Sequence, residues 1–151
     1  MIEFVSGDLF SSGSEALVNA VNTVGVMGGG IAAQFKQKYP EYFLDYKVAC
    51  KTNAVKIGRC YVYVTPLEQP RYIVSLPTKA HWRNASVLAD VETALQHLRW
   101  VVLGCGIESI AIPALGCGLG GLEWEDVKPL IRECLFDLDC DIKVYEPGGH
   151  E

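Results

Sequence analysis

The sequence lacks the signatures of several common protein classes. No apolar run approaches the length that spans a membrane, and the first ten residues lack the basic start and apolar core of a signal peptide. No Cys-x-x-Cys pair and no cysteine–histidine set at zinc-binding spacing occurs among the six cysteines, Cys50, Cys60, Cys105, Cys117, Cys134 and Cys140. These absences favour a reduced, cytoplasmic protein that holds no metal, with disulfides as the less favoured alternative.

Positive charge is also scarce. The 151 residues carry 13 basic and 18 acidic side chains, which gives a formal net charge of -5. Without an overall positive field, any contact with nucleic acid must depend on a local cluster of basic residues. Half of the residues are hydrophobic, which is enough for the core of one compact domain. We therefore expect a single domain over residues 1–151, with a loose tail at 148–151.

The spacing of apolar residues predicts strands that alternate with helices. Strands are expected at 2–6, 16–21, 60–65, 72–76, 109–112 and 142–145. Helices are expected at 31–39, 41–51, 88–102 and 127–135, and Pro40 is expected to end the first. This alternation predicts a three-layer α/β/α domain with a central mixed, largely parallel sheet. Ligands of such sheets bind where loops leave the carboxyl ends of the strands.

Two glycine-rich loops stand out, and each lies between a predicted strand and a predicted helix. The first contains Gly28-Gly29-Gly30, and the second runs from Gly116 to Gly121. Consecutive glycines let a ligand approach the backbone, and a helix that starts at Ile31 directs its free N–H groups and positive dipole end into the same space. The first loop therefore predicts a phosphate-binding site. The alternative is a tight turn that binds no ligand. Together the two loops could hold a diphosphate.

Neither loop matches a common nucleotide signature. No Gly-Lys-Ser/Thr follows either loop, so a P-loop is absent. The second loop resembles Gly-x-Gly-x-x-Gly only when shifted, and no acidic residue ends a further strand about 20 positions later. A dinucleotide-dependent dehydrogenase is therefore disfavoured.

Four segments together resemble the macrodomain family, whose members bind ADP-ribose. They are Gly7-Asp8-Leu9, Ala16-Leu17-Val18-Asn19-Ala20-Val21-Asn22, Gly28-Gly29-Gly30-Ile31-Ala32 and Ile112-Pro113-Ala114-Leu115-Gly116-Cys117-Gly118. The resemblance covers essentially the whole chain. It implies ADP-ribose as the ligand or product and no cofactor.

A narrower resemblance is to the DarG-type antitoxin branch of that family. It is carried by Asn19 to Phe35, Leu115 to Trp124 and, most specifically, Pro77-Thr78-Lys79-Ala80-His81-Trp82-Arg83. These antitoxins remove ADP-ribose from DNA bases modified by a DarT-type toxin. The resemblance implies a glycosidase that cleaves the N-glycosidic bond between ADP-ribose and a DNA base, thymine in particular. The implied partners are ADP-ribosylated single-stranded DNA, ADP-ribose and a DarT-type toxin, with no membrane, and the domain is expected to be monomeric.

The resemblance also implies a role for individual residues. Asp8 would accept a hydrogen bond from the adenine amino group, or alternatively cap its own turn. Asn22 would hold the distal ribose, and Tyr145 would pack beside the adenine or else belong to the core. The implied ADP-ribose-binding residues are Asp8, Leu9, Asn19, Asn22, Gly28, Gly29, Gly30, Ile31, Pro113, Leu115, Gly116, Cys117, Gly118, Leu119, Gly120 and Tyr145.

Lys79 is the implied catalytic residue. As a neutral amine it could attack the anomeric carbon and form a Schiff-base-type adduct that water later cleaves. As an ammonium group it could stabilise negative charge or donate a proton to the leaving base. Both roles stay open, and an exposed surface lysine is the alternative to either.

The residues after Lys79 provide aromatic surface and positive charge beside the implied reactive end. For a substrate attached to DNA, Trp82 or His81 suits a base and Arg83 suits a phosphate. A Trp82 that packs under its own loop is the alternative.

The chain departs from its DarG-type relatives at Gly29, where they carry a lysine that would place a cation beside the phosphates. Gly120 stands where a human protein-directed hydrolase of the family has an acidic catalytic residue, which DarG-type chains lack.

Three functions therefore remain as alternatives. They are release of ADP-ribose from DNA, binding of ADP-ribose without cleavage, and hydrolysis of ADP-ribose from protein carboxylates.

Overall fold

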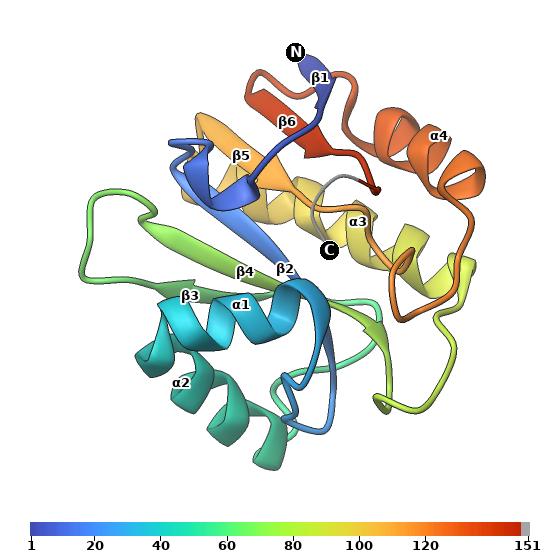
Figure 1. Ribbon diagram of the computed structural model, residues 1–151. Helices are drawn as coiled ribbons and strands as arrows, with labels where there is room; N and C mark the ends of the chain where they lie inside the picture. The colour runs from blue at the N-terminus through green and yellow to red at the C-terminus, as the bar shows by residue number, and fades with distance from the viewer. Residues whose placement is uncertain (149–151) are drawn as a thin grey trace.

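The computed structural model describes residues 1–148, which form one six-stranded sheet between two layers of helices (Figure 1). The strands are β1 (Ile2–Val5), β2 (Ala16–Asn22), β3 (Tyr61–Val64), β4 (Tyr72–Lys79), β5 (Ser109–Ile112) and β6 (Asp141–Tyr145). The helices are α1 (Gly30–Lys38), α2 (Pro40–Lys51), α3 (Leu88–Cys105) and α4 (Trp124–Leu135), with a short 3-10 helix, η1 (Leu9–Ser11), after β1. Each predicted strand and helix is present.

The strand order is β1-β6-β5-β2-β4-β3. Every neighbouring pair is parallel except β3 and β4, which are antiparallel. The predicted three-layer domain with a mixed, largely parallel sheet is therefore confirmed. Because β5, β2 and β4 are adjacent and parallel, their carboxyl ends meet at one edge of the sheet.

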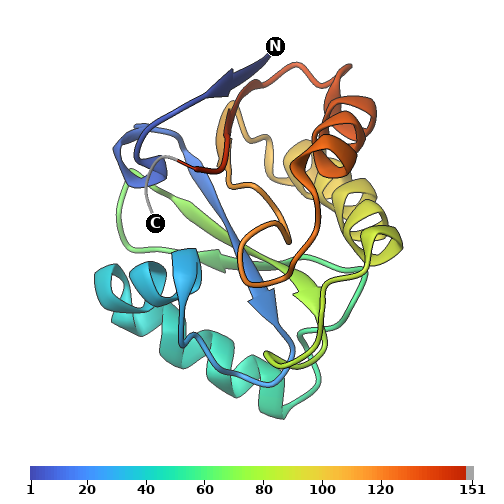
Figure 2. The ribbon, with the colours of Figure 1, turned by 45° about the vertical axis from the view of Figure 1, so that its right-hand side comes forward.

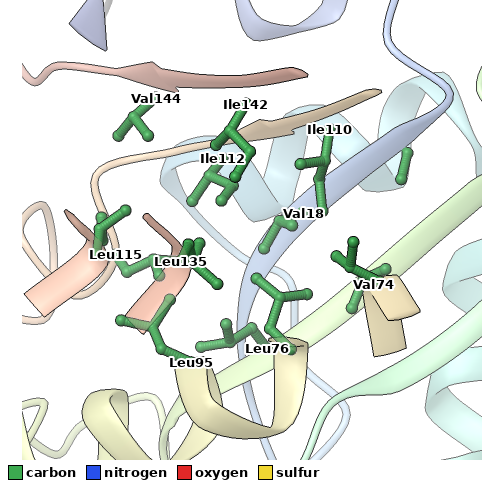
Figure 3. Close-up of a cluster of buried hydrophobic side chains, with 14 of the residues drawn as sticks. Val18, Val74, Leu76, Leu95, Ile110, Ile112, Leu115, Leu135, Ile142 and Val144 are labelled. Atoms are coloured by element: carbon green, nitrogen blue, oxygen red, sulfur yellow. The ribbon is translucent and has the colours of Figure 1, made fainter. Parts of the chain in front are cut away.

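Alternation along β2 builds two separate cores. Ala16 and Val18 face α3 and α4, while Leu17 and Val21 face α1 and α2. Figure 3 shows the first core, in which Val18 packs with aliphatic side chains such as Leu95 from α3. Because both faces of the sheet are covered, its central strands carry apolar residues on both faces, as the apolar run in β2 indicated.

The second core is aromatic. Phe35 of α1 and Tyr42 and Tyr46 of α2 have no solvent exposure, and their rings pack on one another with centroid separations of 6.0–6.5 Å. Figure 2 shows α1 and α2 together on one side of the sheet and α3 and α4 on the other. The buried tyrosine hydroxyls require hydrogen-bond partners, and they find them on residues of β2 and β4.

Two of the boundaries that differ from the prediction involve prolines. Pro40 lies in the first turn of α2, because a proline at a helix start leaves no intrahelical hydrogen bond unmade. Strand β4 continues beyond Leu76, through Pro77 to Lys79. Strand β3 pairs only with the part of β4 up to Ser75, so the last residues of β4 have one neighbouring strand and tolerate the missing N–H of Pro77 as an edge strand would.

All six cysteines are free thiols, so the disulfide alternative is wrong. Within residues 1–148, no helix is both long and apolar enough to cross a bilayer. The tail expected at 148–151 lies, apart from Gly148, outside the described residues.

Candidate functional site

A cavity of about 480 Å³ opens where β2, β4 and β5 end. Both glycine-rich loops contribute to its wall, as does the segment that follows β4. Its lining residues are Ala20, Val21, Asn22, Val26, Gly28, Gly29, Gly30, Ile31, Ala32, Thr78, Lys79, Trp82, Pro113, Ala114, Gly116, Gly118, Leu119 and Gly120. The structure thus brings together at one cavity most of the residues that the sequence singled out.

The first loop ends in an uncapped helix N-terminus. No side chain caps α1 at Gly29, and the first backbone hydrogen bond into the helix runs from Ala33 N to Gly29 O (3.2 Å). The N–H groups of the preceding helical residues have no intrahelical acceptor, and Gly30, Ile31 and Ala32 all line the cavity. This geometry suits an anion such as a phosphate.

The second loop is held close to the start of α3. The backbone N–H of Ser86 donates to Gly120 O (2.9 Å), and the N–H of Leu122 donates to Gly116 O (2.9 Å). A Cβ atom at Gly120 would clash with the Ser86 hydroxyl and with the carbonyl oxygen of Gly116. The position therefore accommodates only glycine, and an acidic side chain there would displace the loop.

Asn22 shapes the first loop with its side chain. Its Nδ2 donates to Val26 O (2.8 Å), and its Oδ1 accepts from Val24 N (3.1 Å). The hydroxyl of Tyr46 donates to both the backbone oxygen (2.7 Å) and Oδ1 (2.9 Å) of Asn22. Burial raises the pKa of Tyr46, so this hydroxyl stays protonated as a donor. Asn22 also lines the cavity, and one Nδ2 hydrogen is left for a sugar hydroxyl.

Lys79 lies opposite Asn22 because of an irregularity in the β2–β4 ladder. The pairing is regular up to Val21 and Pro77, and then Asn22 pairs with Lys79, so that Thr78 is passed over. Bulges of this kind redirect side chains next to active sites. The register shift therefore places Lys79, the predicted catalytic residue, opposite Asn22, whose side-chain amide is predicted to hold the ribose.

The segment after Lys79 folds back over it. The Nζ atom of Lys79 donates to Trp82 O (3.2 Å). The Trp82 ring lies 5.1 Å from the ring of His81 and 4.7 Å from the guanidinium carbon of Arg83. Trp82 is 46% exposed, so the interpretation that it packs under the loop is wrong. Of the three predicted DNA-contacting residues, Trp82 lines the cavity, whereas His81 and Arg83 lie beside it.

Asp8 and Tyr145 lie beyond the cavity, at the ends of β1 and β6. The Asp8 carboxylate accepts hydrogen bonds from Phe10 N (3.0 Å) and the Ser11 hydroxyl (3.2 Å), so it does cap its own turn. Burial and, secondarily, the charge of Asp8 raise the pKa of Tyr145. Tyr145 is half-buried against the aromatic core, so contacts of either residue with adenine stay predictions.

Three predicted binding residues have side chains in the core and not on the cavity. Leu9 and Leu115 are buried in the two hydrophobic clusters. Asn19 has no solvent exposure, and its Nδ2 donates to Tyr42 Oη (3.1 Å). The 3-10 helix, strand and loop that carry these three side chains turn them inward, so contacts of these residues with ADP-ribose stay predictions. Cys117 is half-buried, and burial raises the pKa of its thiol to about 11, which disfavours the reactive thiolate.

Six cavity residues were not predicted from the sequence. They are Ala20, Val21, Val26, Ala32, Thr78 and Ala114. All six lie inside the segments that carry the family resemblance, but apart from Thr78 their small or aliphatic side chains carry no chemical signal. Among residues 1–148, no three histidine, cysteine or acidic side chains gather as ligands for a metal ion.

The fold and the paired loops at the strand ends define the class of protein. The chain belongs to the Macro domain family, whose model matches residues 18–131. Within that class it is similar to the DNA ADP-ribosyl glycohydrolases of Mycobacterium tuberculosis and Thermus aquaticus, with 48% identity to each over 99% and 97% of this chain. The chain spans 43% and 41% of the length of these two relatives.

Solved structures agree with this assignment. The macrodomain of Thermus aquaticus DarG superposes with a TM-score of 0.93 and 48% identity, covering 97% of this chain and 99% of that one. The structure described as Thermosipho africanus DarTG in complex with ADP-ribose superposes with a TM-score of 0.94 and 35% identity. That match covers 99% of this chain and 42% of the other.

Proposed function

We propose that this domain hydrolyses the N-glycosidic bond between ADP-ribose and a DNA base, with thymine as the base. The observation that carries the proposal is the position of Lys79. It lies at the end of β4, paired with Asn22, in a cavity whose other walls are the two glycine-rich loops. A diphosphate held by the loops would leave the distal ribose beside Asn22 and Lys79. The 48% identity to proteins named DNA ADP-ribosyl glycohydrolase supports the choice of substrate.

The reaction breaks the bond from the anomeric carbon to the base nitrogen. The base nitrogen gains a proton, and the hydroxyl group of water ends on the anomeric carbon. Lys79 acts either as a nucleophile, in a transient Schiff-base-type adduct that water resolves, or as a charged donor to the departing base. In both cases the hydrogen bond from Nζ to Trp82 O (3.2 Å) orients the side chain. Water is the only co-reactant, so the proposal needs no cofactor.

The test uses a single-stranded oligonucleotide that carries one ADP-ribosylated thymine. Lys79→Ala should retain binding of ADP-ribose, measured by calorimetry, and should lose release of ADP-ribose. Lys79→Arg keeps the charge but cannot supply a neutral amine. Partial activity in Lys79→Arg supports the charged role, whereas two inactive variants and a wild-type adduct trapped by borohydride support the nucleophile. Unchanged turnover in Lys79→Ala would overturn the assignment.

The same protein should be assayed in parallel on protein with ADP-ribose linked to glutamate. Faster release from that substrate would indicate a protein-directed hydrolase. Tight ADP-ribose binding without release from either substrate would indicate a binding module.

We also propose that the domain acts with a DarT-type toxin, in the cytoplasm. The match to the Thermosipho africanus DarTG structure supports this pairing, and the six free thiols suit a reducing compartment. Co-expression with such a toxin should restore growth with the wild-type domain and not with Lys79→Ala.

A further inference from the structure

Charge is distributed very unevenly along this chain. Residues 46–89 carry seven basic side chains and one acidic side chain, Glu68, whereas the rest of the sequence carries six basic and 17 acidic side chains. A protein with a net charge of -5 thus contains a continuous segment with a net charge of +6.

Part of the positive charge of residues 46–89 lies against the first loop of the cavity. A Cβ atom at Gly25 would lie 3.6 Å from Cγ of Lys47, so the last turns of α2 pack on this loop. On its other side, the backbone N–H and the hydroxyl of Thr23 both donate to Ala80 O (3.2 and 2.8 Å). Ala80 begins the segment that contains Arg83. Lys47 and Arg83 therefore lie on the two sides of the same loop.

The connection between α2 and β3 continues this positive surface. It runs from α2 past the end of β4 to α3 in both views (Figures 1 and 2). At its far end Gly58 packs against Thr93 of α3, and the N–H of Cys60 donates to His97 Nδ1 (2.8 Å). We call the exposed basic residues of this region the basic edge: Lys47, Lys51, Lys56, Arg59 and Arg83.

The far end of the site has the opposite charge. Glu123 and Glu125 lie at the start of α4, directly after the second loop, and Asp8 caps the 3-10 helix that follows β1. At the end near Lys79, the apolar side chains of Trp82 and Val24 are 46% and 47% exposed. The site is therefore acidic at one end, and basic with an exposed aromatic ring at the other.

We propose that the single-stranded DNA bearing the modified base lies along the basic edge, with its phosphates on Lys47 and Lys51 and a neighbouring base on Trp82. This inference rests on the proposed function, because it takes the reactive ribose to lie at Lys79. Cations that follow the backbone and an aromatic ring that stacks on a base are the usual means of binding single strands. A polyanion that left the cavity in the other direction would meet Glu123 and Glu125.

Binding of unmodified DNA tests the surface independently of catalysis. The probe is a fluorescein-labelled 12-nucleotide single strand, and the readout is fluorescence anisotropy over a range of salt concentrations. Lys47→Gln/Lys51→Gln should weaken binding about tenfold at low salt and reduce the salt slope by about 1.4, since each phosphate contact on a single strand contributes about 0.7. The matched control is Lys38→Gln/Arg71→Gln, which removes two exposed positive charges outside the basic edge. Lys38 lies in the last turn of α1, just as Lys51 lies in the last turn of α2. The control should bind as the wild type does.

Cleavage of the ADP-ribosylated oligonucleotide gives the second readout. For Lys47→Gln/Lys51→Gln the KM should rise about tenfold with kcat unchanged, and the affinity for free ADP-ribose should stay the same. Equal DNA binding by the two double variants, or wild-type binding without a salt slope, would overturn the proposed surface. If the wild type binds DNA through these lysines but releases no ADP-ribose, the surface stands and the proposed activity fails.

Discussion

The Cδ1 atom of Leu119 lies 2.8 Å from the point that a Cβ atom on Gly29 would occupy. The two glycine-rich loops, 90 residues apart in sequence, therefore touch across the cavity at this pair. The Leu119 side chain is 75% exposed, so its outer part is free to move. Any side chain placed at position 29 must displace Leu119 before it can reach a ligand.

Gly29→Lys is expected to strengthen binding of ADP-ribose. The φ angle of Gly29 is -158°, an extended conformation open to any residue, so only the flexible Leu119 side chain has to rotate. An added exposed ion pair with a phosphate should lower the Kd about two- to fivefold, and the gain should shrink as salt is added. Calorimetry at two salt concentrations measures it. Gly29→Met occupies similar space without charge, and an equal gain in that variant would rule out electrostatics as the cause.

Gly120→Ala is expected to destabilise the fold and to weaken ADP-ribose binding. Its Cβ would clash with Ser86 and with the backbone of Gly116, and overpacking of this kind costs about 1–3 kcal/mol of unfolding free energy. Chemical unfolding measures the loss. The control is Gly118→Ala, because a Cβ at Gly118 meets nothing within 4 Å. Equal free energies of unfolding for the two variants would show that the second loop can shift to accommodate the added Cβ atom, and would contradict this prediction.

Tyr46→Phe is expected to impair binding through Asn22. Removal of the hydroxyl takes one donor from each of two oxygen atoms of Asn22, although Oδ1 keeps its bond from Val24 N, and the loss should cost about 1–2 kcal/mol of unfolding free energy and loosen the first loop. The Kd for ADP-ribose should rise several-fold. Tyr42→Phe also removes a buried hydroxyl, which bonds Asn19 and Ser75, and should lose similar stability with a smaller effect on binding. The same Kd for both variants would contradict the role given to Tyr46.

His97 is expected to make the fold less stable in mild acid. Burial, with a smaller effect of Arg59, lowers the pKa of His97 in the folded state, and its Nδ1 accepts from Cys60 N only when it carries no proton. Below its ordinary pKa of 6.5 the unfolded chain binds a proton that the folded chain does not, so the unfolding free energy falls as pH falls. His97→Gln should lose less stability than the wild type between pH 7.5 and pH 5.5. Parallel pH profiles of the two proteins would refute this role.

Much of the fold could be predicted because its signals are local. The continuous apolar run in β2 and the helical stripe of α3 mark a covered parallel sheet wherever they occur. The glycines before Ile31 mark an uncapped helix start, and that start does line the cavity. The motifs predict Leu9, Asn19 and Leu115 as site residues, but the direction of a side chain depends on which face of its strand, helix or loop is covered. Local sequence does not determine this.

The sequence by itself determined the order of strands and helices along the chain, the two glycine-rich loops and the presence of Lys79 close after the apolar run 72–76. The tertiary structure decided which of these groups meet. Lys79 faces Asn22 because the β2–β4 ladder skips Thr78, and that shift depends on pairing between residues 57 positions apart in the sequence. Likewise, the charges of Lys47 and Arg83 are visible in the sequence, but they border one loop only because Thr23 is bonded to Ala80 and α2 packs on Gly25. Contacts between residues so far apart in sequence arise from packing of the whole domain, so local patterns do not reveal them.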